Sequence, residues 1–224
     1  MNRRQLLPLG AAFLGACSVL PTRDNQQRRD WPLTPRRPAE LPPAKNGRTL
    51  LIRTMSAGPG MDARGVQWLL KDGSLNTDYY EQWSVPPSQA MEEGLRRWLS
   101  DAGLFAAVVA PGSSVRSDFT LESELTALLA DPQAGTARAS LSLVLLQPKG
   151  DRSRVRLQQT VSAEVRINGT GVEAIVAALR EAAAGALGKA EAAIGAALGV
   201  RTEARLAVPP PLPPVRHDRL AARQ

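Results

Sequence analysis

The chain has little of the chemistry that enzymes use: it contains one histidine and one cysteine among 224 residues, and aromatic residues make up 4% of it. The histidine, His217, lies in a basic C-terminal segment, so a Ser-His-Asp triad or a histidine-rich zinc site inside a domain lacks its essential groups. A Walker loop, a dinucleotide-binding glycine fingerprint and an HExxH motif are also missing. The sequence therefore predicts a non-enzymatic protein with no metal and no cofactor.

A long apolar run is missing from the N-terminus as well. A spanning helix needs about 20 apolar residues, whereas the N-terminal run extends only from Leu6 to Phe13 and contains Pro8. Arg3 and Arg4 precede this run and small residues follow it, which is the layout of a secretory signal. Both the general and the twin-arginine export routes stay open, because the arginine pair matches the twin-arginine pattern only loosely.

The signal ends in four residues that resemble the bacterial lipobox, Leu14-Gly15-Ala16-Cys17. In lipoproteins with this motif the thiol sulfur receives a diacylglyceryl group, the leader is cut before the cysteine, and the new amino group is acylated. We therefore expect residues 1–16 to be removed and Cys17 to carry lipid; a plain signal peptide with an incidental cysteine is the alternative. Ser18 stands where inner-membrane lipoproteins often carry Asp, so the resemblance implies an anchor in outer-membrane lipids and a domain in the periplasm.

The net charge of +7 comes from the ends of the chain. Residues 1–16 carry +2, residues 18–48 carry +4 and residues 199–224 carry +3, whereas residues 49–198 hold fourteen basic and sixteen acidic side chains. Non-specific nucleic-acid binding depends on clustered Lys and Arg that release counterions. We therefore expect no nucleic-acid partner, and basic ends that are either solvated or held near anionic lipid headgroups.

Two proline-rich segments flank the candidate domain. Residues 17–48 contain six prolines among arginine, glutamine and aspartate, and predict a lipidated cysteine followed by an extended tether. Residues 199–224 include the run VPPPLPPV and predict a disordered basic tail. The remaining residues, 49–198, suit one domain of ordinary size.

The strands of this domain are predicted from alternating apolar residues and turn signals. Residues 49–55 and 105–109 predict single strands, and residues 66–70 and 75–85 predict a hairpin across Lys71-Asp72-Gly73-Ser74. Residues 119–165 alternate with period two and break at two turns, which predicts a three-strand antiparallel meander.

Two helices complete the predicted fold. Met91, Leu95 and Trp98 form one apolar stripe on a helix that opens at Pro86-Pro87. Thr170 and Glu173 predict a capping box for a second, longer helix. The expected class is α+β, a mixed, mainly antiparallel sheet with two helices packed on one face.

The strand at residues 75–85 also contains the candidate contact residues. Its segment Tyr79-Tyr80-Glu81-Gln82-Trp83 places aromatic side chains on both faces of one strand. Aromatic side chains that stay exposed often anchor interfaces, so we name Tyr79, Tyr80 and Trp83 as candidate partner contacts.

Two runs, GMDARGVQWLLKDG and DYYEQWSVPPSQAMEEGLRRWLSDAGLFAAVVAP, resemble the ABC-type transport auxiliary lipoproteins, the PqiC-like family. The resemblance covers about residues 49–198, and Met61 departs from the Leu or aromatic residue expected there. It implies a non-enzymatic outer-membrane lipoprotein that docks an MCE-domain protein and its inner-membrane transporter, which move lipids across the periplasm. A homo-oligomeric ring is one form that such docking takes.

Two other functions stay open. A lipid carrier with its own cavity is the main alternative, although the many alanines and glycines favour tight packing. A lipoprotein hydrolase is the weaker one, because the domain has no histidine to act as a base.

Replacing Cys17 with Ser should abolish lipidation, because the acyl transfer needs a nucleophilic sulfur. Intact-mass spectrometry of the native protein should show a chain that begins at Cys17 and carries acyl groups, and the Cys17→Ser chain should carry none. A bare thiol or a retained leader in the native protein would contradict the expectation.

Overall fold

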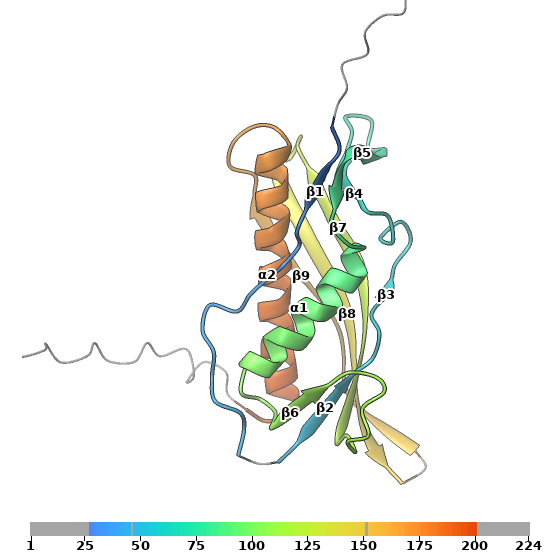
Figure 1. Cartoon of the computed structure of the whole chain (residues 1–224), viewed down its shortest axis with the longest axis vertical. Helices are drawn as coiled ribbons and strands as arrows, with labels where there is room; N and C mark the ends of the chain where they lie inside the picture. Colours follow the sequence, from blue (N-terminus) through green and yellow to red (C-terminus); the bar gives the residue numbers. More distant parts are fainter. Residues whose placement is uncertain (1–26, 46, 151, 201–224) are drawn as a thin grey trace, which may run out of the picture.

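The computed structural model describes residues 27–45, 47–150 and 152–200. Its centre is a meander of three long antiparallel strands: β7 (Phe119–Asp131), β8 (Thr136–Lys149) and β9 (Arg152–Arg166) (Figure 1). The register of β7 and β8 runs from Thr120 opposite Leu146 to Asp131 opposite Thr136. Alternate residues of β7 and β8 face the core, as period two requires, and β9 is buried only at Val161 and Ala163. The predicted meander is confirmed.

Shorter strands extend the sheet on the far side of β7. They are β1 (Arg29–Trp31), β2 (Thr49–Ile52), β3 (Ser56–Ala57), β4 (Gly65–Leu69), β5 (Leu75–Trp83) and β6 (Ala107–Val109). β4 and β5 form the predicted antiparallel hairpin, whereas β2 and β3 run parallel to β7 and β1 runs parallel to β5. Within the described residues the sheet is therefore mixed, and the strands of the meander are its longest antiparallel part.

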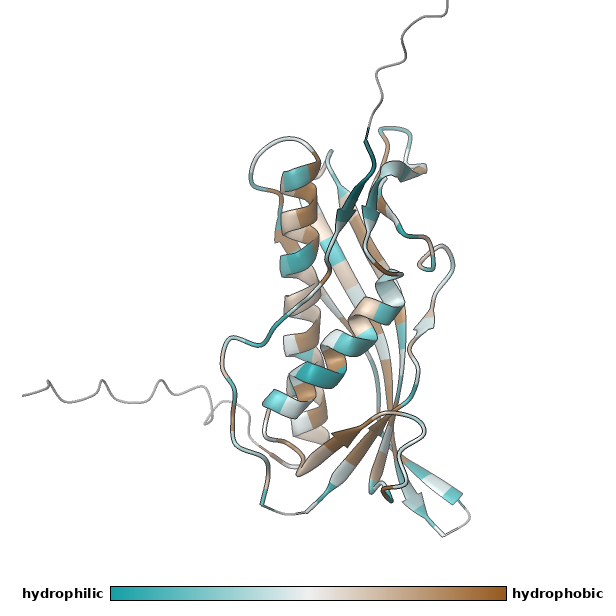
Figure 2. Ribbon diagram, in the orientation of Figure 1, coloured by the Kyte–Doolittle hydropathy of each residue, from teal (hydrophilic) through white to brown (hydrophobic). Residues whose placement is uncertain are grey.

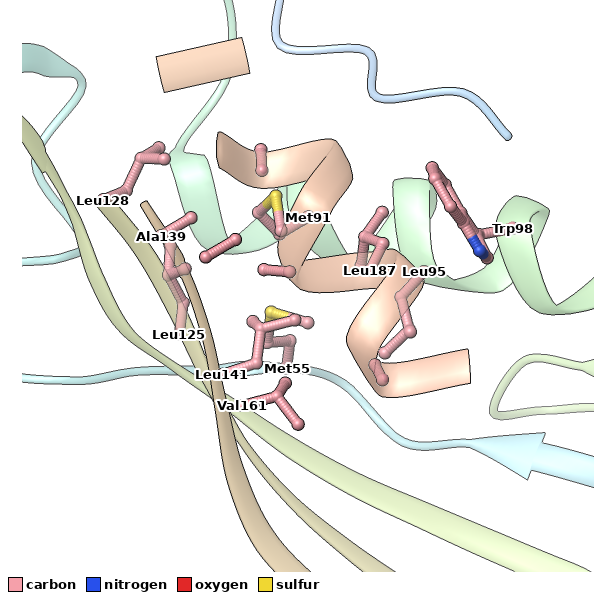
Figure 3. Packing of buried hydrophobic residues seen from close by; sticks show 14 of the residues in the cluster. Met55, Met91, Leu95, Trp98, Leu125, Leu128, Ala139, Leu141, Val161 and Leu187 are labelled. Atoms are coloured by element: carbon pink, nitrogen blue, oxygen red, sulfur yellow. The ribbon is translucent and has the colours of Figure 1, made fainter. Parts of the chain in front are cut away.

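Both helices, α1 (Pro87–Asp101) and α2 (Val172–Ala197), cover the same face of the sheet (Figure 1). The outward side of α1 is mostly hydrophilic (Figure 2). Its inward residues meet α2 and the sheet in one core, which includes Met91, Leu95, Leu187, Leu125 and Leu141 (Figure 3). The predicted fold class, α+β with two helices on one face, is confirmed.

The first turn of α2 differs from the prediction. Gly171, with a φ of 85°, is the N-cap, and no side chain caps the helix there. The helix therefore begins one residue beyond the position that would make Thr170 its cap, and the predicted capping box is wrong. The carboxylate of Glu173 pairs instead with Arg29 of β1.

Residues 27–45 form a strap across the domain, which corrects the predicted tether over that range. β1 pairs with β5, and Leu33 is buried in the core. Further along, the N–H of Leu41 donates to the carbonyl of Asp101 at 2.8 Å, and the N–H of Ala44 donates to that of Phe105 at 3.0 Å. The folded body thus begins well before residue 49, while residues 17–26 lie outside the described residues.

The strap also changes the charge of the folded body. Residues 27–200 hold twenty basic and eighteen acidic side chains, so the mildly acidic domain expected from residues 49–198 becomes weakly basic. At least three of the eight added charges form ion pairs: Arg29 with Glu81 and Glu173, Asp30 with Arg64, and Arg37 with Glu191.

Two glycines of α2 make a matched pair for testing how closely this helix packs on β9. A Cβ on Gly185 would lie 2.9 Å from the Cβ of Ala163, whereas one on Gly188 would lie 3.6 Å from Trp98. Gly188→Ala should stabilise the protein by up to about 1 kcal/mol through helix propensity. Gly185→Ala should instead destabilise the protein by about 1–3 kcal/mol through overpacking. This loss offsets or exceeds the gain in helix propensity.

Urea unfolding of both variants measures this difference. The packing argument fails if Gly185→Ala proves as stable as Gly188→Ala.

Candidate functional site

The predicted lipid site lies outside the described residues. Cys17 and the residues before it, Leu14, Gly15 and Ala16, are therefore still predictions. What the structure places is Gln27, ten positions after Cys17, where the described chain begins beside the β4–β5 hairpin (Figure 1). The surface around this point is the candidate functional site.

A large bulge in β5 shapes the surface. Gly65 of β4 is opposite Gln82 and Gln67 is opposite Thr77, so the four residues 78–81 of β5 stand opposite one residue of β4. The Asp78 carboxylate holds the bulge, since it accepts the N–H of Tyr80 at 2.6 Å and that of Glu81 at 2.9 Å. Gly65 is required where β4 passes the bulge of β5, because a Cβ at this position would clash with the carbonyl oxygen of Asp78.

The bulge exposes both predicted tyrosines. Tyr79 is 66% exposed and Tyr80 is 41% exposed, and their rings meet edge to face with centroids 5.2 Å apart. The guanidinium of Arg28 lies 4.6 Å from the centre of the Tyr79 ring, a cation–π contact that joins the strap to the hairpin. Tyr79 and Tyr80 thus stay candidate contact residues.

Trp83 does not belong to this surface, which corrects the third candidate. It is 1% exposed and lies in the core, because β5 regains its register after the bulge and pairs there with β1, Trp31 opposite Trp83. Sequence reasoning also missed two exposed leucines, Leu70 and Leu75, which flank the hairpin turn. Their position beside the turn residues Lys71-Asp72-Gly73-Ser74 was the available signal.

Charged groups tie the strap to both layers near the bulge. Glu81 accepts the Nε–H of Arg29 at 2.8 Å and the indole N–H of Trp31 at 2.7 Å. Arg29 also pairs with Glu173 in the first turn of α2, and this hydrogen bond lowers the pKa of the Glu173 carboxyl group. Strap, hairpin and helix therefore meet at the place where the chain leads toward Cys17.

A buried ion pair holds the middle of the strap. Arg37 forms a fork with Glu191 of α2: Nε to Oε2 at 3.0 Å and Nη2 to Oε1 at 3.1 Å. Trp98 of α1 donates its indole N–H to Oε2 of Glu191 at 2.7 Å, and Arg37 also donates to the carbonyl of Ala39. The side chains of Arg37 and Glu191 are only 2% and 6% exposed. This three-residue contact, the Arg37 clamp, joins the strap to both helices.

An apolar groove of about 620 Å³ adjoins the Arg37 clamp. The strap, α1, β9 and α2 line it. Six of its lining residues are Ala or Gly, including Gly185 and Gly188, and six are charged, so the apolar floor has a charged border. The volume is within the usual range of ligand pockets. The small residues pack closely where α2 meets β9, as Gly185 does against Ala163, and they leave an open groove beside the strap.

Other chemistry is sparse in the part of the chain that the structure describes. Over residues 27–45, 47–150 and 152–200, no group of three or more His, Cys, Asp or Glu side chains is placed to hold a metal ion. In the same ranges, neither helix is both long and apolar enough to cross a membrane.

The fold and site define a two-layer α+β domain whose N-terminal strap leads toward the predicted lipid site. The model of the family described as ABC-type transport auxiliary lipoprotein component matches residues 32–188. The chain belongs to this family, and the resemblance seen in the sequence is confirmed. The family match begins inside the strap, which agrees with the strap being part of the fold.

Solved structures support the fold. The crystal structure of protein XCC0632 from Xanthomonas campestris is similar over 76% of this chain and 96% of its own, with 21% identity and a TM-score of 0.60. The crystal structure of an uncharacterized protein matches over 69% and 95%, with 18% identity and a TM-score of 0.56. No curated protein matches the chain.

Replacing Arg37 with Ala should cost about 3–5 kcal/mol of stability, because it leaves the buried Glu191 carboxylate without its partner. Arg36→Ala is the matched control: Arg36 is the exposed neighbour of Arg37 in the strap, and its loss should change stability by no more than about 0.5 kcal/mol. Thermal and urea unfolding measure both variants. Equal stabilities would show that the Arg37 clamp does not hold the strap.

Proposed function

We propose that this protein is an outer-membrane lipoprotein that acts as a non-enzymatic docking component of an MCE-type ABC lipid transport system. The observation that supports the proposal is the family match over residues 32–188, which makes the chain an auxiliary component of an ABC-type transporter. The MCE partner, its inner-membrane transporter and the outer-membrane anchor through Cys17 are the specific parts of the proposal.

The geometry suits a component whose role is to hold a binding surface at a fixed place. A docking protein has to hold its surface at a set distance from the membrane, and the strap is already part of the folded body at β1, twelve positions after Cys17. The Arg37 clamp and the Arg29 ion pairs fix the strap on both helices and on β5. The exposed Tyr79 and Tyr80 are the proposed contact residues.

Assembly into a homo-oligomeric ring is part of the same proposal. Within the described residues β9 pairs only with β8, so one edge of this fifteen-residue strand is open. Arg152, Arg154 and Arg156 are exposed along it, and charged side chains at a sheet edge disfavour pairing with another strand. A ring would therefore form through side-chain contacts rather than through a continuous sheet.

A second function, lipid carriage in a cavity of the protein itself, is favoured by one observation, the groove beside the Arg37 clamp. Its apolar lining and volume suit an acyl chain. Lipid that co-purifies with the unlipidated domain at one molecule per chain would support this function.

The docking proposal predicts that the purified, lipidated protein captures the MCE-domain protein of its own cell from detergent-solubilised membranes. A Tyr79→Ser/Tyr80→Ser variant should show whether these side chains take part, and Val115→Ser serves as control for loss of an exposed apolar residue elsewhere. Deleting the gene should sensitise the cell envelope to detergents.

Failure of the wild-type protein to retain an MCE-domain protein, with no envelope defect on deletion, would count against docking. Lipid at fixed stoichiometry in that case would favour the carrier function instead.

A further inference from the structure

The exposed apolar side chains of the protein are concentrated in one hairpin. Of the seven large apolar residues exposed in the described part of the chain, four lie in or beside the β4–β5 hairpin: Leu70, Leu75, Tyr79 and Tyr80. We call these four residues the hairpin patch. The other three, Val85, Val115 and Val155, lie on separate segments. Exposed apolar side chains that are concentrated in one part of a polar surface often mark a binding surface.

The hairpin patch lies where the chain leaves the domain toward Cys17. β1 runs parallel to β5, with Arg29 opposite Glu81, so the chain before β1 heads back along β5 toward the hairpin turn. Arg28 already contacts Tyr79 there. Figure 1 shows β1 beginning at the same end of the molecule as the β4–β5 hairpin.

The number of residues from Cys17 to Gln27 decides which end of the domain can face the membrane. Gln27 is ten positions after Cys17, and a fully extended chain of ten residue steps spans at most about 35 Å. The β8–β9 turn is at the opposite end of the molecule (Figure 1). β8 begins near the hairpin, because Trp68 is opposite Ala130 and Ala130 is opposite Ala137. Its fourteen residues then extend about 46 Å away.

A bilayer that holds Cys17 therefore cannot lie against the β8–β9 turn while the strap is docked, because the reach from Gln27 to Cys17 is shorter than β8. It can lie against the hairpin end. That end also has the suitable chemistry, because tyrosine rings and leucine side chains favour the boundary between headgroups and acyl chains. The rival orientation would place exposed basic residues of the far end, Lys149, Arg152 and Arg154, on anionic headgroups.

We propose that the hairpin patch inserts into the headgroup region of the bilayer that holds the Cys17 lipid, so that the β8–β9 turn points away from that membrane. This inference revises the contact proposed above for Tyr79 and Tyr80, whose partner is then the lipid surface rather than a protein. The inference rests on the lipid anchor of the proposed function, and it adds the orientation of the domain on the membrane.

Two lysines make a matched pair for testing the orientation. Lys71 is exposed in the β4–β5 turn and Lys149 is exposed next to the β8–β9 turn. In the lipidated protein the sulfur of Cys17 is alkylated, so Lys71→Cys and Lys149→Cys each supply the only free thiol for an environment-sensitive fluorophore. Both variants lose one positive charge, and both are reconstituted in vesicles of phosphatidylethanolamine and phosphatidylglycerol that contain a lipid with a nitroxide quencher near its headgroup.

The probe at position 71 should shift its emission to the blue and be quenched several-fold more than the probe at position 149. Adding Leu75→Ser should reduce the quenching at position 71, whereas adding Val155→Ser, the exposed apolar control at the far end, should not. Stronger quenching at position 149 would overturn the orientation.

Intact-mass spectrometry of the same samples separates the two possible failures. A lipidated chain whose two probes are equally unquenched overturns the bilayer contact alone, and leaves the hairpin patch as a protein-binding surface. A bare thiol at position 17 overturns the lipid anchor of the proposed function together with this inference.

Discussion

The buried ion pair between Arg37 and Glu191 is the constraint on which the rest of the arrangement depends. Two charges removed from water are tolerated only when their hydrogen-bonding groups are satisfied, and here the guanidinium fork and the Trp98 indole N–H share the two carboxylate oxygens. Because the three residues come from the strap, α1 and α2, the pair fixes a polar, proline-rich segment to both helices. Without it, residues 27–45 would lose their only deeply buried polar attachment among the described residues.

A docked strap gives the domain a defined relation to its predicted anchor. A free tether from residue 17 to residue 48 would let the body turn in any direction, whereas the nine residues between Cys17 and Gln27 limit both distance and direction. The strap enters the sheet beside the bulge that exposes Tyr79 and Tyr80. Family membership, anchor and surface are then consistent with a protein that contributes by position to a transport system, as an auxiliary component is expected to do.

The sequence predicted the parts of the fold that are encoded locally. Period-two alternation gave the meander, the Lys71-Asp72-Gly73-Ser74 turn gave the hairpin, and the Met91, Leu95 and Trp98 stripe gave α1. The strap was missed because its partners are far away in sequence: Arg37 is 154 positions from Glu191, and Arg29 is 52 positions from Glu81. Proline and arginine in a local window are typical of a tether, and only the tertiary contacts override that pattern.

The candidate site also divides into features that local sequence predicts and features that depend on distant residues. An aromatic strand was predicted correctly, but a regular strand cannot expose Tyr79 and Tyr80 together. The bulge held by Asp78 does so, and it returns Trp83 to the core. The bulge depends on Gly65 in the neighbouring strand, and Asp78 was its one signal within residues 75–85. The Thr170 cap failed for a similar reason, since Gly171 is the N-cap of α2 and Arg29, from another part of the chain, pairs with the carboxylate of Glu173.

Amide hydrogen exchange over residues 27–45 of the full-length protein tests the central claim, that the strap is part of the fold. The N–H groups of Leu41 and Ala44, which donate to the carbonyls of Asp101 and Phe105, should exchange as slowly as amides of α1, because local opening there requires breaking the Arg37 clamp. Exchange of these two amides at the rate of an unstructured chain, while α1 remains protected, would contradict the account.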